Sequence, residues 1–272
     1  PLLRIRAIDS TMLVALNEIA AAQSKGTKHT AKAVVQLLNY CATHPHAVVR
    51  YHASDMVLHI DSDASYLSLP AARSRSGRHY YLSSKSTNPA KAHTSSPPMN
   101  GSVHTVCNRL KHVMASAAEA EVGALFLNGQ EATVLRTTLQ DLGHQQPATP
   151  VKTDNSTAAG IANNSIKQRR SRAMDMRFYW IRDRVLQGQF IVYWKPGTNN
   201  MGDYYTKHHS PAHHQLMRSH YLHTKHSQCT QQTPFSLTMP RGCVNSRMTH
   251  PTQRITDHAQ TAAQQPLIGI LA

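Results

Sequence analysis

Residues 56–68, which read MVLHIDSDASYLS, decide the fold class. Apolar residues 56–58 and Ile60 run into two carboxylates, Asp61 and Asp63, and then into small and polar residues. This order predicts a buried β-strand that delivers an acid at or just beyond its end. Because side chains alternate along a strand, Asp61 and Asp63 are expected on the same face of the sheet. On this stretch alone, a strand that ends in an Asx-type turn with both acids solvated is an equally good interpretation.

The balance of charge is strongly basic. The 272 residues include 29 Lys and Arg against 14 Asp and Glu, a formal net charge of +15 with the 19 histidines counted as neutral. Such a surplus favours a polyanionic partner, nucleic acid above all, because each phosphate contact releases condensed counterions. A basic solvated surface or a basic tail is the alternative. The length allows one large domain or two small ones.

The cysteines, the apolar runs and the first residues of the chain indicate the kind of compartment in which the protein is expected. The widely spaced Cys41, Cys107, Cys229 and Cys243 include no CxxC pair, which argues against a zinc finger and a disulfide framework and fits a reducing compartment. No run of about 18 apolar residues occurs, so no membrane span or membrane partner is expected. The first residues lack both a signal-peptide pattern and an initiator Met, so we expect the chain to begin inside a longer open reading frame.

The first 49 residues predict a pair of helices. Residues 10–24 have helical apolar spacing, and a second helix is expected to be capped by Thr30 and ended by Pro45. An antiparallel pair packed beside the next domain is the simplest arrangement. Glu18 is expected to be a solvated helix acid.

The pattern then changes to strands. After residues 56–68, a turn at 76–77 precedes a short strand at 80–82, and residues 101–110 predict a third strand, which together form an antiparallel meander. Two helices are expected next, at 116–127 and 131–142, separated by a stop at the intervening Asn-Gly pair.

The second half alternates strands with helices. Strands are predicted at 150–155 and 189–194, helices at 157–163 and 174–187, and a last helix from residue 201 to 207, with Trp180 and Trp194 in the core. The expected fold class is α/β, a five-stranded mixed sheet with three antiparallel strands and two parallel additions, flanked by helices. Residues 225–272 are rich in Gln, Thr, Ser and His and predict a tail of low order.

Four acids stand at strand ends and helix starts, the positions where α/β proteins gather a site: Asp63, Glu121, Asp154 and Asp203. Converging carboxylates repel one another, and divalent cations relieve that repulsion. Hard oxygen ligands favour Mg²⁺ or Mn²⁺, and two such ions about 4 Å apart can support in-line hydrolysis of a phosphodiester. Four unrelated surface acids are an equally good interpretation of the positions alone.

Four stretches in this order resemble a known family: HIDSDASYLSLPAARSRSG, ASAAEAEVGALF, PVKTDNSTAAGIANN and RAMDMRFYWIRDRVLQGQFIVYWKPGTNNMGDYYTKHH. They resemble the ribonuclease H domain of copia-type retrotransposon Pol polyproteins, over roughly residues 50–222. The preceding AIDSTMLVALNEIAAAQ and AVVQLLNYCATHP resemble the stretch that joins reverse transcriptase to that domain. The resemblance implies a ribonuclease H-like fold with connection helices at 1–49, the nuclease domain at 50–224 and the tail at 225–272.

The resemblance also implies an activity, the hydrolysis of the RNA strand of RNA–DNA hybrids by an enzyme that binds two Mg²⁺ ions, with Mn²⁺ as a substitute. The implied catalytic and metal-binding residues are Asp63, Glu121, Asp154 and Asp203. Asp61 and Glu119 are expected to be structural, and Ser65 and Val122 depart from the family's usual residues. The implied partners are the hybrid and the reverse transcriptase of the same polyprotein, in the cytoplasm, a virus-like particle or the nucleus. A catalytically inactive nucleic-acid-binding remnant, or a connection module that serves only the polymerase, is the alternative.

Two further clusters have open interpretations. A basic segment could contact the hybrid backbone or form a solvated helix face; its main residues are Lys167, Arg169, Arg170, Arg172 and Arg177, followed by Arg182 and Arg184. A solvated helix end is favoured over a zinc site for a second group, His208, His209, His213 and His214. His208 or His209 as a proton shuttle near Asp203 is a further alternative.

Overall fold

A central five-stranded sheet organises the computed structural model, which describes residues 8–85, 99–166 and 175–223. The strands are β1 (Val57–Leu69), β2 (Arg73–Ser83), β3 (Ser102–Arg109), β4 (Thr149–Thr153) and β5 (Phe190–Trp194), in the spatial order β3-β2-β1-β4-β5. β1, β2 and β3 pair antiparallel, while β4 runs parallel to both β1 and β5. This topology confirms the mixed sheet expected from the sequence.

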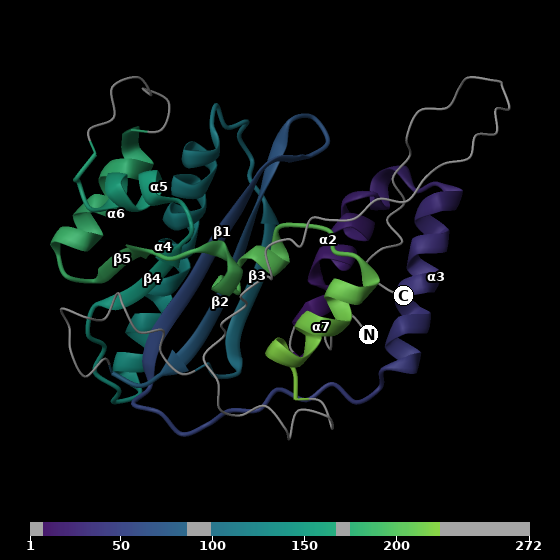
Figure 1. Ribbon diagram of the computed structural model, residues 1–272, viewed down its shortest axis with the longest axis horizontal. Helices are drawn as coiled ribbons and strands as arrows, with labels where there is room; N and C mark the ends of the chain where they lie inside the picture. The colour runs from purple at the N-terminus through teal and green to yellow at the C-terminus, as the bar shows by residue number, and fades with distance from the viewer. Residues whose placement is uncertain (1–7, 86–98, 167–174, 224–272) are drawn as a thin grey trace, which may run out of the picture. The chain divides into compact units, whose positions relative to one another are not determined.

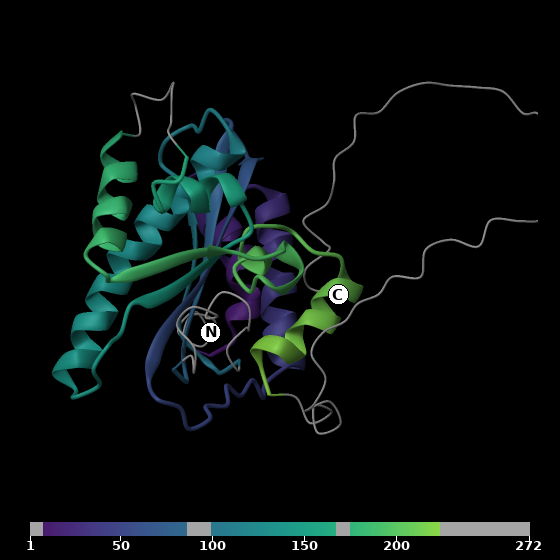
Figure 2. The ribbon, with the colours of Figure 1, turned by 60° about the vertical axis from the view of Figure 1, so that its left-hand side comes forward.

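Helices cover both faces of this sheet (Figure 1). One face carries α4 (Ala117–Asp141), α5 (Ser156–Ala162) and α6 (Asp175–Leu186), and the other carries α2 (Leu13–Ala21), α3 (Lys28–Thr43) and α7 (Pro211–Tyr221). The turned view in Figure 2 shows the same separation. Four short 3-10 turns complete the described elements: η1 (Ser10–Met12), η2 (Gln23–Lys25), η4 (Gly197–Asn199) and η5 (Asp203–Tyr205).

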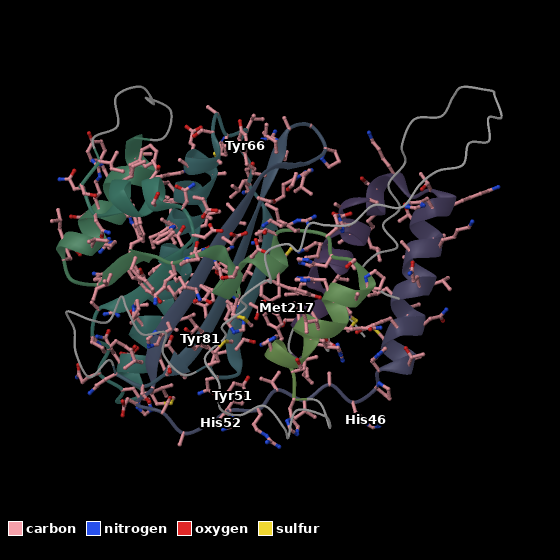
Figure 3. All side chains as sticks on the ribbon, in the orientation of Figure 1. His46, Tyr51, His52, Tyr66, Tyr81 and Met217 are labelled. Atoms are coloured by element: carbon pink, nitrogen blue, oxygen red, sulfur yellow. The ribbon has the colours of Figure 1, made fainter. Side chains whose placement is uncertain are left out.

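Each face has its own hydrophobic core. Leu58 and Ile60 of β1 pack with Val122 and Leu125 of α4 in the first core. The second core is richer in aromatic residues and includes Tyr40, Tyr204, Tyr205 and Tyr221 together with Met12 and Leu16. Figure 3 labels Tyr81 of β2 and Met217 of α7 on the side of this second core. Burial of apolar area on both faces stabilises the sheet between two helical layers.

The described residues all lie within one compact unit. The helices before residue 50 contribute half of the second core, since Leu13, Leu16 and Leu37 pack there with the aromatic residues of the later chain. The division of the chain at residue 49 stays a prediction, and residues 225–272 lie outside the described ranges. Within those ranges, no helix combines the length and hydropathy needed to span a bilayer.

The predicted break in the helix after β3 is wrong. A single helix, α4, continues through Asn128 and Gly129 to Asp141. Asn128 is fully buried, and its side-chain amide donates to Ser62 and accepts from Arg78. A side chain at Gly129 would lie 2.9 Å from the ring of Trp180. The Asn-Gly pair therefore serves tertiary packing against β1, β2 and α6, which overrides its local preference for ending a helix.

The predicted turn at residues 76–77 is also wrong. β2 begins at Arg73, and Gly77 lies inside it, paired with Asp63 on one side and Cys107 on the other. A Cβ atom on Gly77 would lie 2.4 Å from the carbonyl oxygen of Gly202. Glycine is present because another stretch of backbone lies directly against the strand.

Two helix boundaries differ from the sequence expectation. Thr27 caps α3, and Thr30 is the N3 residue of its capping box. The helix predicted at 201–207 is only the short turn η5, and the true last helix is α7, capped by Ser210 with Pro211 at its first position.

Candidate metal and catalytic site

Three of the four predicted acids converge at one edge of the sheet. Asp63, Glu121 and Asp154 each offer a carboxylate oxygen, and these oxygens all lie within 4.8 Å of one another. Asp63 is in β1, Asp154 directly follows the parallel strand β4, and Glu121 is in the second turn of α4. The parallel pairing of β1 with β4 sets Asp61 opposite Lys152, so Asp63, which lies within β1 rather than at its end, becomes a neighbour of Asp154 just beyond β4.

Hydrogen bonds hold two of these carboxylates in place. The two oxygens of Glu121 accept from the backbone N–H of Ala64 at 3.0 Å and from the hydroxyl of Thr153 at 3.2 Å. The Oδ2 atom of Asp63 accepts from the hydroxyl of Thr206 at 2.5 Å. Bonds of this kind orient a ligand group before any ion or substrate binds.

The electrostatics of the cluster favour a bound cation. Burial raises the pKa of Asp63, and the charges of Asp203 and Asp154 raise it further. Burial and the neighbouring Asp63 and Asp154 raise the pKa of Glu121 well above its usual range. Burial, followed by the charge of Asp203, raises the pKa of Asp154. Each raised pKa means that ionising the carboxylate, buried and beside other acids, costs free energy. A bound divalent ion offsets that cost.

Asp203, the fourth predicted residue, stands at the rim of the cluster. It lies in η5, outside the group of three, and its carboxylate forms an ion pair with Lys207 one turn later. Its charge nevertheless raises the pKa of both Asp63 and Asp154, so it is within electrostatic reach of them. The metal-binding and catalytic roles of all four residues stay predictions.

A tightly packed segment delivers Asp203 and Thr206 to the site. A Cβ atom on Gly202 would lie 2.9 Å from the carbonyl oxygen of Asp61, and one on Gly197 would lie 2.6 Å from Oδ2 of Asp154. The chain after β5 therefore lies against β1 and β4 with no room for side chains at these glycines. Sequence reasoning assigned no role to Thr153, Thr206 or these glycines, because nothing local in the sequence signals a contact with distant backbone.

Asp61 lies on the same side of β1 as Asp63 but outside the group of three. Both residues accept from the 201–206 segment, Asp61 from the backbone N–H of Met201 at 3.0 Å. The carboxylate of Asp61 also pairs with the buried ammonium of Lys152 at 2.5 Å. This contact pattern agrees with a structural role for Asp61. Sequence reasoning missed Lys152 because a lysine inside a short strand is usually exposed.

Glu119 is part of the start of α4. Its carboxylate accepts from the backbone N–H of Ala115, and its own N–H donates to the side chain of the N-cap residue Ser116. These contacts belong to helix capping rather than to the cluster of acids. Val122 is buried in the first core, and the Ser65 hydroxyl bonds to that of Ser68 near the end of β1, so the two departures from the family pattern lie in core packing and in a contact within β1.

Most of the predicted basic segment, including Lys167, Arg169, Arg170 and Arg172, lies outside the described residues. Arg177 is half-buried on α6, with its guanidinium 5.9 Å from the centre of the Phe126 ring. It lines a cavity of about 380 Å³ together with Arg78, Arg109 and Lys111. The lining of this cavity contains none of the three clustered carboxylates. A contact between Arg177 and nucleic acid stays a prediction.

The histidines after β5 do not form one solvated helix end. His214 is 1% exposed, with its ring between the hydroxyls of Tyr40 and Tyr204. His209 stacks on the ring of Tyr204 at 4.5 Å, whereas His213 is exposed to solvent. The interpretation is therefore wrong for His214, because aromatic partners from α3 and η5 bury it. Among the described residues, the only group of His, Cys, Asp and Glu with metal-site spacing is the three acids.

Two further expectations are corrected by the structure. Glu18 is an ion-pair partner rather than a solvated acid, with Arg75 at 2.5 Å and His208 at 2.6 Å. Trp194 is 50% exposed and does not belong to the core, whereas Trp180 is partly buried and packs against the first core. Trp194 leaves the core because β5 ends there, at the same edge as the cluster of acids.

Part of the sequence is similar to that of a known protein. No family model matches the chain. A stretch of 98 residues is 35% identical to the retrovirus-related Pol polyprotein from transposon TNT 1-94 of Nicotiana tabacum. The chain is similar to a transposon Pol polyprotein. The match covers 36% of this chain and 7% of the polyprotein, so this chain spans a small part of that relative.

Solved structures with a similar arrangement include ribonuclease H proteins. LC11-RNase H1, isolated from compost by a metagenomic approach, matches over 56% of this chain and 93% of its own, with 12% identity and a TM-score of 0.40. The protease-reverse transcriptase of prototype foamy virus matches over 54% of this chain and 18% of its own, with 13% identity and a TM-score of 0.33. The sheet order and strand directions of the present chain are those of the mixed sheet expected from its sequence, three antiparallel strands with two parallel additions.

Proposed function

We propose that this chain is a metal-dependent endonuclease that hydrolyses the RNA strand of RNA–DNA hybrids. It would act as part of a retrotransposon polyprotein that also carries reverse transcriptase. The observation that carries the proposal is the convergence of Asp63, Glu121 and Asp154, whose oxygens lie within 4.8 Å of one another. The similarity to a transposon Pol polyprotein supports the retrotransposon setting.

The donor set fits a hard divalent cation. All three groups are carboxylates, and the oxygens of Asp63 and Glu121 are buried where uncompensated negative charge is costly. Asp63, Glu121 and Asp154 would hold Mg²⁺ or Mn²⁺, and Asp203 at the rim would complete a site for a second ion. When bound, such ions lower the pKa of a water molecule and stabilise the charge that develops on a phosphodiester.

The protein's own residues prepare this site. Thr206, Thr153 and the N–H of Ala64 fix the carboxylate oxygens of Asp63 and Glu121, so that little reorganisation is needed when substrate binds. Asp63 and Glu121 are buried, whereas Asp154 and Asp203 are only half-buried. The scissile phosphate would therefore approach from the side of Asp154 and Asp203. The exposed ammonium of Lys207 stands on that side, where it can attract the phosphate backbone.

The test is cleavage of an end-labelled RNA–DNA hybrid with and without Mg²⁺. We expect cleavage only with the metal. Asp63→Asn and Asp154→Asn should each lower kcat by more than the roughly 10- to 100-fold typical of residues that only orient a metal ligand. Asp141→Asn, at the exposed end of α4, is the matched control and should retain activity.

Two other outcomes of this test would favour the alternative functions instead. A parent chain that binds the hybrid without cleaving it, in the presence of Mg²⁺ or Mn²⁺, would be an inactive nucleic-acid-binding remnant. A chain that neither binds nor cleaves would be a connection module for the polymerase. Either result would overturn the proposed activity.

A further inference from the structure

Trp194 is an exposed aromatic residue at the edge of the candidate site. Phe190 and Val192 precede it on the same face of β5 and are buried in the first core. Trp194 continues this alternation but is 50% exposed, because the strand ends there and the ring extends beyond the core. A tryptophan combines a large apolar ring with a polar N–H, so a half-exposed indole that is fixed through its N–H still presents apolar surface to a ligand.

The indole of Trp194 is held in one orientation. Its Nε1–H donates to the backbone carbonyl of Asp154 at 2.9 Å. β5 pairs Trp194 with Thr153 of β4, and the N–H of Lys195 donates to the carbonyl of Thr153 at 3.1 Å. The ring is therefore tied through its polar edge to the residue that contributes the third carboxylate of the cluster. Its apolar faces remain available for another group.

The chain that follows Trp194 also runs beside the cluster of acids. Gly197 follows three residues later and lies against the carboxylate of Asp154, so the chain turns closely around that acid. Trp194 stands at the start of this turn, and Asp154, to which its indole is bonded, is only half-buried. A substrate strand whose phosphate reached Asp154 would approach the residue to which this ring is bonded.

We propose that Trp194 contacts the substrate, with an exposed face of its indole packed against a ribose or base of the nucleotide next to the cleaved phosphodiester. This inference rests on the proposed nuclease function and names one of its substrate contacts. The contact requires no particular base, because every nucleotide presents a ring face and a sugar face. It suits the shallow minor groove of an A-form-like hybrid, where sugars and 2′-hydroxyls are accessible.

Fluorescence gives a test that does not depend on catalysis. The chain has 2 tryptophans, so Trp180→Phe leaves Trp194 as the only indole. Trp180 lies edge-on to Phe126 and packs near Phe190, so phenylalanine is a conservative replacement there. We expect a saturable change in the emission of Trp194 when a short RNA–DNA hybrid is added at low salt with EDTA present. The converse variant, Trp194→Phe, should show a much smaller change on addition of the same hybrid.

Kinetics separate a substrate contact from a structural role. Trp194→Ala should raise KM for the hybrid by about tenfold, in the range of one stacking contact, and leave kcat within about twofold. Trp194→Phe keeps a ring and loses the bond to Asp154, and it should retain most of the affinity. If Trp194→Phe and Trp194→Ala both lowered kcat with KM unchanged, the indole would act by positioning Asp154, and the proposed contact would be wrong. Circular dichroism of both variants checks that the fold is intact.

The outcomes for the contact and for the nuclease are distinct. Cleavage of the hybrid with no response from Trp194 and no change in KM would overturn the contact alone. A response from Trp194 without cleavage would support the contact and overturn the nuclease proposal. Emission that changes with protein concentration in the absence of hybrid would show that another copy of the chain covers the ring, and this would also overturn the contact.

Discussion

At the scale of single residues, buried polar side chains are concentrated in β1 and β2. Asp61 and Lys152 form a buried ion pair, and Arg75 and Arg78 of β2 are at most 3% exposed. Each of these charges has a partner, which buried charges require because the loss of one partner leaves the other uncompensated. His79 is different, since neither of its ring nitrogens has a hydrogen-bond partner.

The buried His79 should make the free energy of unfolding depend on pH. Burial, together with the charge of Lys152, lowers its pKa to about 3, whereas an unfolded histidine has a pKa of about 6.5. The unfolded state therefore gains a proton first as the pH falls. The contribution of His79 is fully present above pH 6.5 and is lost progressively toward pH 3. Between pH 7 and pH 5 the free energy of unfolding should fall by about 2 kcal/mol on account of this residue.

The variant His79→Phe tests this effect. Phenylalanine preserves a ring that faces Tyr81 and Tyr205, breaks no side-chain hydrogen bond and cannot be protonated. The free energy of unfolding in urea should be measured at pH 7 and at pH 5 for both proteins. Its decrease from pH 7 to pH 5 should be about 2 kcal/mol smaller in the variant than in the parent. His29→Phe, at an exposed position in α3, should leave the difference unchanged. An equal difference in parent and His79→Phe would contradict the prediction.

At the scale of elements, the position of the 201–206 segment depends on a close approach between backbones. β2 and η5 meet at Gly77 and Gly202, and the same segment carries Asp203 and Thr206 to the candidate site. The geometry of the site is therefore set partly by β2, a strand that contributes none of its acids.

Gly77→Ala should disturb both stability and the site. A new Cβ atom would lie 2.4 Å from the carbonyl of Gly202 and 2.7 Å from the side chain of Thr206, and backbone cannot move away cheaply. We expect a loss of about 1–3 kcal/mol in the free energy of unfolding, as in other overpacked interiors. Hybrid cleavage should fall as well, because Thr206 would shift away from Asp63.

A matched glycine provides the control. A Cβ atom added to Gly26 would meet nothing within 4 Å, and the residue has a negative φ of −60°. Gly26→Ala should be neutral or stabilise by up to about 1 kcal/mol, through a smaller entropy of the unfolded chain. Equal stability of Gly77→Ala and Gly26→Ala in chemical denaturation would show that the close approach to Gly202 is absent in solution.

At the scale of the whole molecule, the helices before residue 50 cover one face of the sheet. Tyr40 of α3 contacts His214 of α7, and Glu18 of α2 bridges Arg75 of β2 and His208. The second core draws on both ends of the described chain. This arrangement explains how a segment that resembles a connection to reverse transcriptase can also stabilise the sheet that carries the candidate site.

Deletion of residues 1–49 should therefore destabilise the remainder. It would expose Cys107 and the aromatic residues of η5 and α7, and it would leave the buried Arg75 without Glu18. We expect a lower thermal midpoint and stronger binding of a hydrophobic dye than in the full chain. Addition of the 1–49 fragment in trans should restore part of the loss. A truncated chain that melts within about 2 °C of the full chain would show that the division at residue 49 is also a folding boundary.

The sequence by itself determined the order of the elements and the identity of the converging acids. Local apolar periodicity specified most strands and helices, because it is carried by residues near one another in the chain. The resemblance of four motifs to a known family singled out Asp63, Glu121, Asp154 and Asp203, of which the first three converge. Only the tertiary structure decided what lies around them. Gly77 was predicted as a turn, Asn128 as a helix stop, His214 as solvated and Trp194 as buried. Each of these residues takes its environment from partners distant in sequence, and burial by such partners outweighs local propensity.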